Sequence, residues 1–201
     1  QWACEQEGFP VPTEAEVRSV IGPPFEIGLP SIGIPDDALG RVINRYRERY
    51  TETGAFENTL YDGILDMLDE LAALGLSLSI ATAKPEQTAH PILDYFDISD
   101  RFDVRAGASL TSDRRTKAQV IDHALRELEI KADPDLGDHV IMIGDRDHDV
   151  LGAMHHGITC IGVTWGYGSP EELLRAGAVA LADSPSEVAE LVMQPYRLRH
   201  A

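Results

Sequence analysis

Short apolar runs alternate with longer amphipathic segments over most of the chain from Tyr61 onward. The short runs are rich in Ile, Val and Ala and end at polar residues or glycine, a pattern typical of strands in a parallel sheet. The longer segments carry apolar residues at helical spacing. The pattern predicts strands at 76–82, 102–106, 140–144, 159–163 and 179–182, and helices at 64–74, 86–96, 117–130, 150–156, 171–176 and 185–193. Strands that alternate with helices indicate an α/β fold, with a Rossmann-like, three-layer core in which helices cover both faces of a parallel sheet.

The first 58 residues show a different pattern, with short helical segments and no predicted strand. Thr13 followed three residues later by Glu16 is a capping box and predicts the start of a helix. The Gly-Pro-Pro run at 22–24 is expected to end that helix. We therefore expect a small helical domain over 1–58 and an α/β core over 59–201.

The apolar run at 140–144 stops abruptly at three carboxylates, Asp145, Asp147 and Asp149. Ligands of open α/β sheets sit beyond the carboxyl ends of the strands, and carboxylates crowded there repel one another unless a cation joins them. Hard oxygen ligands suit Mg²⁺. The alternative is an acidic turn that caps the next helix, and we favour it for Asp147 alone. For Asp145 with Asp149 we favour a metal site.

Thr82 and Ala83 stand where a predicted strand gives way to a helix. A hydroxyl at this point can donate to a phosphate oxygen, and the free backbone N–H groups of a helix start favour anions. An ordinary capping hydroxyl is the alternative for Thr82. Pro85 is expected at the first helical position.

Lys117 opens a predicted helix, although the helix dipole disfavours cations at that end. Such a conflict between a local rule and the sequence indicates a functional position. Lysine is scarce in this chain, which contains only Lys84, Lys117 and Lys131. The Lys117 ammonium could neutralise a bound phosphate or hold a carboxylate ionised; the alternative is an exposed lysine. The Trp-Gly-Tyr-Gly run at 165–168 either lines the mouth of a site or forms a turn with packed aromatic residues.

Composition narrows the range of partners. The 201 residues carry a formal net charge of −17, which argues against binding to nucleic acid or to anionic membranes. Two distant cysteines, Cys4 and Cys160, make neither a disulfide framework nor a zinc site, and we expect both to be buried in a reducing cytoplasm. No stretch is long and apolar enough to span a bilayer. Because the first residue is Gln1, we expect the sequence to begin inside a longer chain.

Three motifs in a fixed order resemble the haloacid dehalogenase (HAD) superfamily: Thr82, then Lys117, then the GDRDHD segment, each after a predicted strand. The ATAKP turn and the WGYGSPEEL run are similar to the phosphoglycolate phosphatase and 5′-nucleotidase-like branch. The resemblance implies a phosphatase that hydrolyses small phosphorylated metabolites through an aspartyl-phosphate with Mg²⁺. It implies that Asp145 is a metal ligand, that Asp149 supports the metal site, that Thr82 and Ala83 hold the phosphate, and that Lys117 balances the charges of nucleophile and phosphate. Residues 1–58 would be the cap that excludes water from the site.

The sequence departs from this family at one point, because the first motif, Asp-x-Asp-Gly-Thr, occurs nowhere in it. In the family that motif carries the nucleophile on a central strand between the strands that end here at Thr82 and Asp145. Loss of this strand would leave two sheet edges unpaired, at a cost of about 1–3 kcal/mol for each buried unpaired group. Either upstream residues are missing from the sequence, or the protein rearranges or borrows a strand from a neighbouring molecule. We favour missing upstream residues, and we expect no phosphatase turnover from this polypeptide.

Two other functions stay open. A HAD-like module without catalytic activity would bind a ligand or partner, and a dehalogenase or phosphomutase could use the same scaffold. A homodimer is possible.

Overall fold

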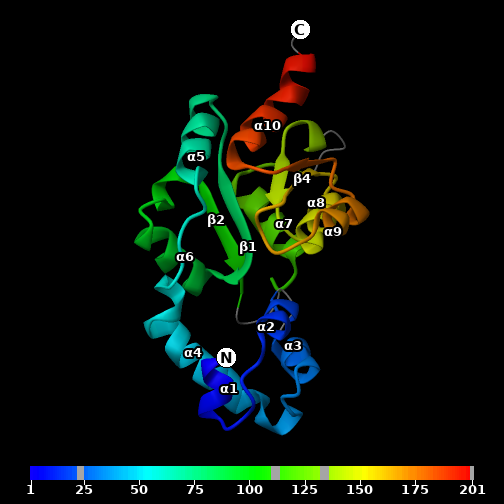
Figure 1. The fold of residues 1–201 in the computed structure, drawn as a ribbon. Helices are drawn as coiled ribbons and strands as arrows, with labels where there is room; N and C mark the ends of the chain where they lie inside the picture. Colours follow the sequence, from blue (N-terminus) through cyan, green and yellow to red (C-terminus); the bar gives the residue numbers. More distant parts are fainter. Residues whose placement is uncertain (22–24, 110–113, 132–135, 200–201) are drawn as a thin grey trace. The chain divides into compact units, whose positions relative to one another are not determined.

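The computed structural model describes residues 1–21, 25–109, 114–131 and 136–199 (Figure 1). The expected helix stop at 22–24 lies outside these residues. The chain forms two compact units, Gln1–Thr59 and Leu60–Ala201, and each is described by itself.

The first unit contains helices and no strand among its described residues. It contains α1 (Trp2–Gln6), α2 (Glu14–Ser19), α3 (Phe25–Ser31), α4 (Leu39–Glu52) and two 3-10 turns, η1 (Asp36–Ala38) and η2 (Gly54–Phe56). The capping box predicted at the start of α2 is confirmed: the Glu16 amide donates to Thr13 Oγ1 at 3.3 Å, and the Thr13 amide donates to Glu16 Oε2 at 2.8 Å. Leu29, Ile34, Val42 and Ile43 form part of a separate apolar core.

The second unit has the predicted alternation of helices and strands. Its strands are β1 (Ser79–Pro85), β2 (Val104–Ala108), β3 (Ile141–Gly144), β4 (Thr159–Val163) and β5 (Ala180–Ala182). Its helices are α5 (Ile64–Ala73), α6 (Glu86–Tyr95), α7 (Lys117–Glu127), α8 (Asp147–His155), α9 (Pro170–Ala176) and α10 (Pro185–Arg199), with 3-10 turns η3 (Ser99–Arg101) and η4 (Leu136–Asp138).

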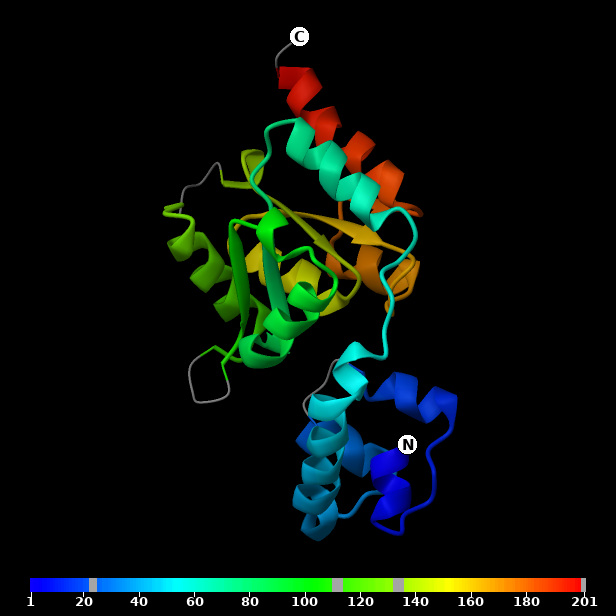
Figure 2. The ribbon, with the colours of Figure 1, turned by 90° about the vertical axis from the view of Figure 1, so that its left-hand side faces the viewer.

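The strand pairs are all parallel, so the α/β fold class is confirmed, but the described strands form two separate sheets. One sheet contains β1 and β2, and the other has the order β3-β4-β5. Helix α7 packs against β1, β2 and α8, while α8 packs against β3 and β4. One layer of helices therefore runs under both sheets, and α5 and α10 lie side by side on the other face (Figure 2). Among the described strands, no ladder joins β1 to β3.

The burial of β3 differs from the sequence-based expectation. We expected a strand buried on both faces, yet Ile141, Met142 and Ile143 are only half-buried. By contrast, β4 is buried from Cys160 to Val163. The reason is the number of partner strands: β4 pairs on both edges, whereas β3 pairs with β4 alone among the described strands.

Several boundaries also differ from the predicted ones. β1 begins at Ser79 and continues to Pro85, which is the last strand residue and not the first helical one. Helix α8 begins at Asp147, three residues earlier than predicted, so Asp147 lies in its first turn and Arg146 is the N-cap residue. Both cysteines are buried and free, as expected. No described helix has the length and apolar content to cross a membrane.

Candidate active site

Lys117 links strand β1 to helix α8, which follows β3. Its ammonium donates to the Ala81 carbonyl of β1 at 2.6 Å and forms an ion pair with Asp149 Oδ1 at 2.8 Å. The two side chains are almost completely buried, at 8% exposure for Lys117 and 6% for Asp149. The lysine that conflicted with the dipole of its own helix is therefore stabilised by a buried carboxylate on another helix.

A glycine in α8 leaves room for this lysine. A Cβ atom at Gly152 would lie 2.7 Å from Lys117 Cγ, which is closer than carbon atoms approach in proteins. Glycine inside a helix costs about 1 kcal/mol relative to alanine, so a packing reason is expected. The sequence carried this signal, but nothing in it indicated which residue the glycine accommodates.

Asp149 holds the turn that follows β3. Its Oδ2 atom accepts hydrogen bonds from the amides of Asp145 and Arg146, at 3.2 and 3.1 Å. Since Oδ1 meets Lys117, the carboxylate is engaged at both oxygens by groups of this chain. Asp149 thus fits a supporting role behind the metal site better than a role as a direct ligand.

Asp145 is positioned by the glycine run that follows β4. Its Oδ2 atom accepts from the Tyr167 amide at 2.8 Å, and its carbonyl accepts from the Gly168 amide at 2.9 Å. A Cβ at Gly166 would lie 2.2 Å from Asp145 Cβ, so only glycine fits there. The run at 165–168, which the sequence left open, therefore lies directly against the candidate metal ligand.

A second anchor fixes the same turn from α9. Glu172 Oε1 accepts from Arg146 Nε at 2.8 Å and from the Asp147 amide at 3.0 Å. The hydrogen bond with Glu172 raises the pKa of Arg146 above its ordinary value. Sequence reasoning did not identify Glu172, because the partner lies 25 residues from Asp147 and belongs to another helix.

Thr82 and Ala83 lie where β1 leaves its ladder. Thr82 pairs with Gly107 and Pro85 pairs with the next residue, so Ala83 and Lys84 bulge out of the strand and are exposed. Thr82 Oγ1 accepts from the Lys84 amide at 3.1 Å, which leaves the hydroxyl hydrogen to point elsewhere. Bulges of this kind occur next to active sites, where they redirect polar groups. Thr82 also follows Ala81, the residue whose carbonyl Lys117 contacts.

These contacts bring the expected site residues to one end of the second unit. Lys117 touches both the β1 segment that contains Thr82 and the Asp149 carboxylate that holds the Asp145 amide. Asp147 Oδ1 instead accepts from the His148 amide at 2.7 Å and takes no part in these contacts.

The carboxylates give a limited set of metal ligands. No cluster of three or more His, Cys, Asp or Glu side chains suited to a metal exists within the described ranges. Asp145 is half-buried and Asp149 is engaged on both oxygens, so of these two described carboxylates Asp145 is the one that could meet a cation directly. Mg²⁺ is commonly held by one or two carboxylates together with water and substrate phosphate. The donor set is compatible with Mg²⁺ on that basis, with Asp145 as the candidate ligand.

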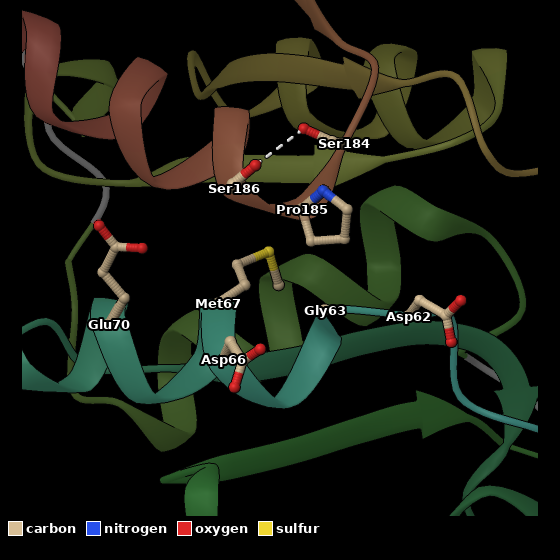
Figure 3. Close-up of a pocket in the computed structure, with 8 residues that line it drawn as sticks. All are labelled: Asp62, Gly63, Asp66, Met67, Glu70, Ser184, Pro185 and Ser186. Carbon is tan, nitrogen blue, oxygen red and sulfur yellow. Dashed lines mark hydrogen bonds between the residues drawn. The ribbon is translucent and has the colours of Figure 1, made fainter.

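A cavity of about 400 Å³ lies elsewhere, between α5 and the start of α10 (Figure 3). Residues in and just before α5 line one side of it: Asp62, Gly63, Asp66, Met67 and Glu70. Residues at the start of α10 line the other: Ser184, Pro185 and Ser186. Thr82, Lys117 and Asp145 are not among these residues. The cavity therefore does not mark the candidate active site.

Comparisons with known proteins identify the family of this chain. A family described as haloacid dehalogenase-like hydrolase matches residues 1–163. The tyrosine-protein kinase PtkA of Mycobacterium tuberculosis is 40% identical over 166 residues, which cover 83% of this chain and 55% of that protein. A 5′-nucleotidase of Pseudomonas aeruginosa is 36% identical over 174 residues, covering 86% of this chain and 76% of the nucleotidase. This chain thus spans little more than half the length of the first of these curated relatives.

Solved structures give the same result for the fold. The crystal structure of a predicted phosphatase from Clostridium acetobutylicum superposes with a TM-score of 0.84 at 34% sequence identity, covering 96% of this chain and 88% of that one. The family resemblance carried by Thr82, Lys117 and the GDRDHD segment is confirmed, and the chain belongs to the haloacid dehalogenase-like hydrolase family.

Proposed function

We propose that the second unit is the core of a Mg²⁺-dependent phosphatase that hydrolyses small phosphorylated metabolites through an aspartyl-phosphate. The observation that carries the proposal is the Lys117 ammonium, which contacts both Ala81 of β1 and Asp149 of α8. A buried cation, paired with the carboxylate that holds the backbone of Asp145, is suited to a phosphate and a metal ion together.

Each residue would have a distinct task in this site. The Thr82 hydroxyl and the backbone of Ala83 would bind phosphate oxygens, and Lys117 would offset the charge of the transferring group. Asp145 would hold Mg²⁺, with Asp149 fixing its backbone. The metal would supply charge stabilisation for the phosphoryl oxygens. The helical unit would act as a cap over the site.

The nucleophile is the component that no residue of this sequence supplies, because the Asp-x-Asp-Gly-Thr motif is absent from it. We propose that this polypeptide binds phosphate and Mg²⁺ but does not turn over phosphomonoesters. The relatives have different names, among them a 5′-nucleotidase and a tyrosine-protein kinase, and these names do not agree on a substrate. The substrate of this chain is therefore to be identified by testing a panel of compounds.

The test measures binding and turnover separately. Calorimetry with Mg²⁺ and inorganic phosphate should detect binding that is lost in Asp145→Asn. A panel of p-nitrophenyl phosphate, phosphoglycolate and nucleoside monophosphates should give no Mg²⁺-dependent hydrolysis. Hydrolysis by this polypeptide would overturn the proposed inactivity, and failure to bind phosphate or Mg²⁺ would overturn the site.

The second candidate is a HAD-like binding module without catalytic activity. The absence of the first motif from the sequence favours it. The same assay on a longer chain, where the gene encodes one, distinguishes the two functions. Turnover supports the phosphatase, and ligand binding without turnover supports the binding module.

A further inference from the structure

Glu86 lies at the point where the proposed phosphate-binding segment passes into α6. We call residues 82–85, where β1 leaves its regular ladder, the β1 bulge. Glu86 follows this bulge directly and is the first residue of α6. Its Oε1 atom accepts a hydrogen bond from the Gly107 amide at 3.2 Å, and Gly107 is the residue that pairs with Thr82 in the β1–β2 ladder. The Glu86 side chain therefore joins the start of α6 to β2 beside Thr82.

The backbone is packed closely at the same place. A Cβ atom at Gly107 would lie 2.6 Å from the Lys84 carbonyl oxygen and 2.9 Å from the Glu86 amide nitrogen, so only glycine lets the β1 bulge approach β2 this closely. A carboxylate in the first turn of a helix interacts favourably with the helix dipole, which is the simplest role for Glu86. That role needs no partner from another element, whereas the Glu86 carboxylate also meets β2 and the segment before α7.

Arg114 is the main charged partner of this carboxylate. Its Nη2 atom lies 2.9 Å from Glu86 Oε1, and the two side chains are 19% and 30% exposed. His123 of α7 adds a longer contact, with Nε2 3.8 Å from the same oxygen, and carries a charge only when it is protonated. Arg114 lies just before Lys117, the residue that opens α7. The ion pair therefore connects the β1 bulge with the segment that leads to Lys117.

The charge of Glu86 makes this ion pair relevant to phosphate binding. The Lys117 ammonium is paired with the Asp149 carboxylate, so its charge is shared before any phosphate binds. An unpaired carboxylate beside Thr82 would repel a phosphate, and partial burial would strengthen the repulsion because it lowers the effective dielectric constant. Arg114 offsets this charge.

We propose that Glu86 and Arg114 are positioning residues of the phosphate site. Their ion pair holds the β1 bulge against β2, so that Thr82 and Ala83 meet the phosphate oxygens, and it cancels a carboxylate charge that would repel phosphate. Neither of the two side chains contacts the phosphate itself. The proposal rests on the proposed function, because it takes Thr82 and Ala83 as the residues that bind phosphate.

The first experiment measures the affinity of the full chain for inorganic phosphate by calorimetry, with Mg²⁺ present and at pH 8, which keeps histidine side chains mostly neutral. Arg114→Met should weaken binding about tenfold, because it leaves the Glu86 charge unpaired. Glu86→Gln should strengthen binding about threefold, since the guanidinium is then unpaired and the amide oxygen still accepts from Gly107. The double variant should return to within about threefold of the wild-type affinity.

The control for the loss of one positive charge is Arg126→Met, whose ion pair with Asp122 is exposed, and it should bind phosphate as the wild type does. An ion pair that serves stability alone predicts that both single variants weaken binding and that the double variant binds no better than Arg114→Met. That order would overturn the proposal, as would equal affinities in the wild type and the three variants. Where thermal unfolding shows that Arg114→Met is not folded, Glu86→Gln decides, because the two accounts predict effects of opposite sign for it.

The second experiment follows the backbone of the β1 bulge by amide hydrogen exchange. The Gly107 amide should exchange at least about tenfold faster in Glu86→Ala, which removes its acceptor, than in Glu86→Gln, which keeps one. Equal exchange rates in the two variants would overturn the positioning role. If the wild-type chain binds no phosphate, the proposed function fails and this inference fails with it. If the chain binds phosphate and the expected differences are absent, this inference alone fails.

Discussion

The buried pair of Lys117 and Asp149 is expected to be the largest single electrostatic contribution to the stability of the candidate site. Replacing Lys117 with methionine keeps the side-chain length and removes the charge. The Asp149 carboxylate, 6% exposed, would then lose the Lys117 ammonium and keep the amides of Asp145 and Arg146 on Oδ2, with His148 Nε2 at 3.8 Å from Oδ1. Its Oδ1 atom would remain buried, and the nearest basic group would be the His148 ring, which carries a charge only when it is protonated.

Removing one partner of a buried ion pair costs about 3–5 kcal/mol. The two backbone donors that remain on Asp149 place the expected loss near the lower limit, at about 3 kcal/mol. For a chain of this size, each kcal/mol lowers the unfolding temperature by about 2–4 °C, so we expect a decrease of about 6–12 °C.

The assay is urea unfolding of the wild-type protein, Lys117→Met, Asp149→Asn and the double variant. The coupling energy from this cycle should be about 1–3 kcal/mol, as for residues in direct contact. Arg126→Met is the control, because its ion pair with Asp122 is exposed and contributes about 0–1 kcal/mol. A coupling energy below about 0.5 kcal/mol would refute the buried ion pair.

Three further predictions concern single positions. Gly166→Ala should destabilise the protein by about 1–3 kcal/mol in thermal unfolding, because the added Cβ would overlap Asp145. The control is Gly40→Ala, which adds a Cβ in open space on α4 and should be neutral or stabilising. Equal effects of the two substitutions would contradict the packing argument. Burial raises the pKa of Cys160 from 9.0 to about 12. The stability that the protonated thiol contributes should therefore be present below pH 9 and be lost as the pH rises towards 12. If a Cys160→Ala variant loses as much stability over the same pH range, the loss does not come from this thiol and the prediction is wrong. Thr13→Ala should cost about 1 kcal/mol in urea unfolding through loss of the α2 cap, and an unchanged midpoint would argue against the capping box.

Much of the site could be predicted from the sequence because its motifs are local. Residues that follow a short apolar strand lie at its carboxyl end in any parallel sheet, so the sequence placed Thr82 and Asp145 at the same edge. The dipole conflict at Lys117 likewise marked a position with a partner elsewhere. Spacing alone grouped Asp149 with Asp145 as a metal site, because a ligand and a support have the same side chain and differ only in their contacts; the supporting task came from the family resemblance.

The sequence by itself determined the order of helices and strands, the α/β class and the family, since periodicity and motif order are properties of neighbouring residues. Only the tertiary structure decided how those elements meet: the two sheets, the half-burial of β3, and the glycines at 152 and 166 that make room for Lys117 and Asp145. These features depend on contacts between residues far apart in the chain. No local pattern encodes such distances, because packing fixes them only when the chain is folded.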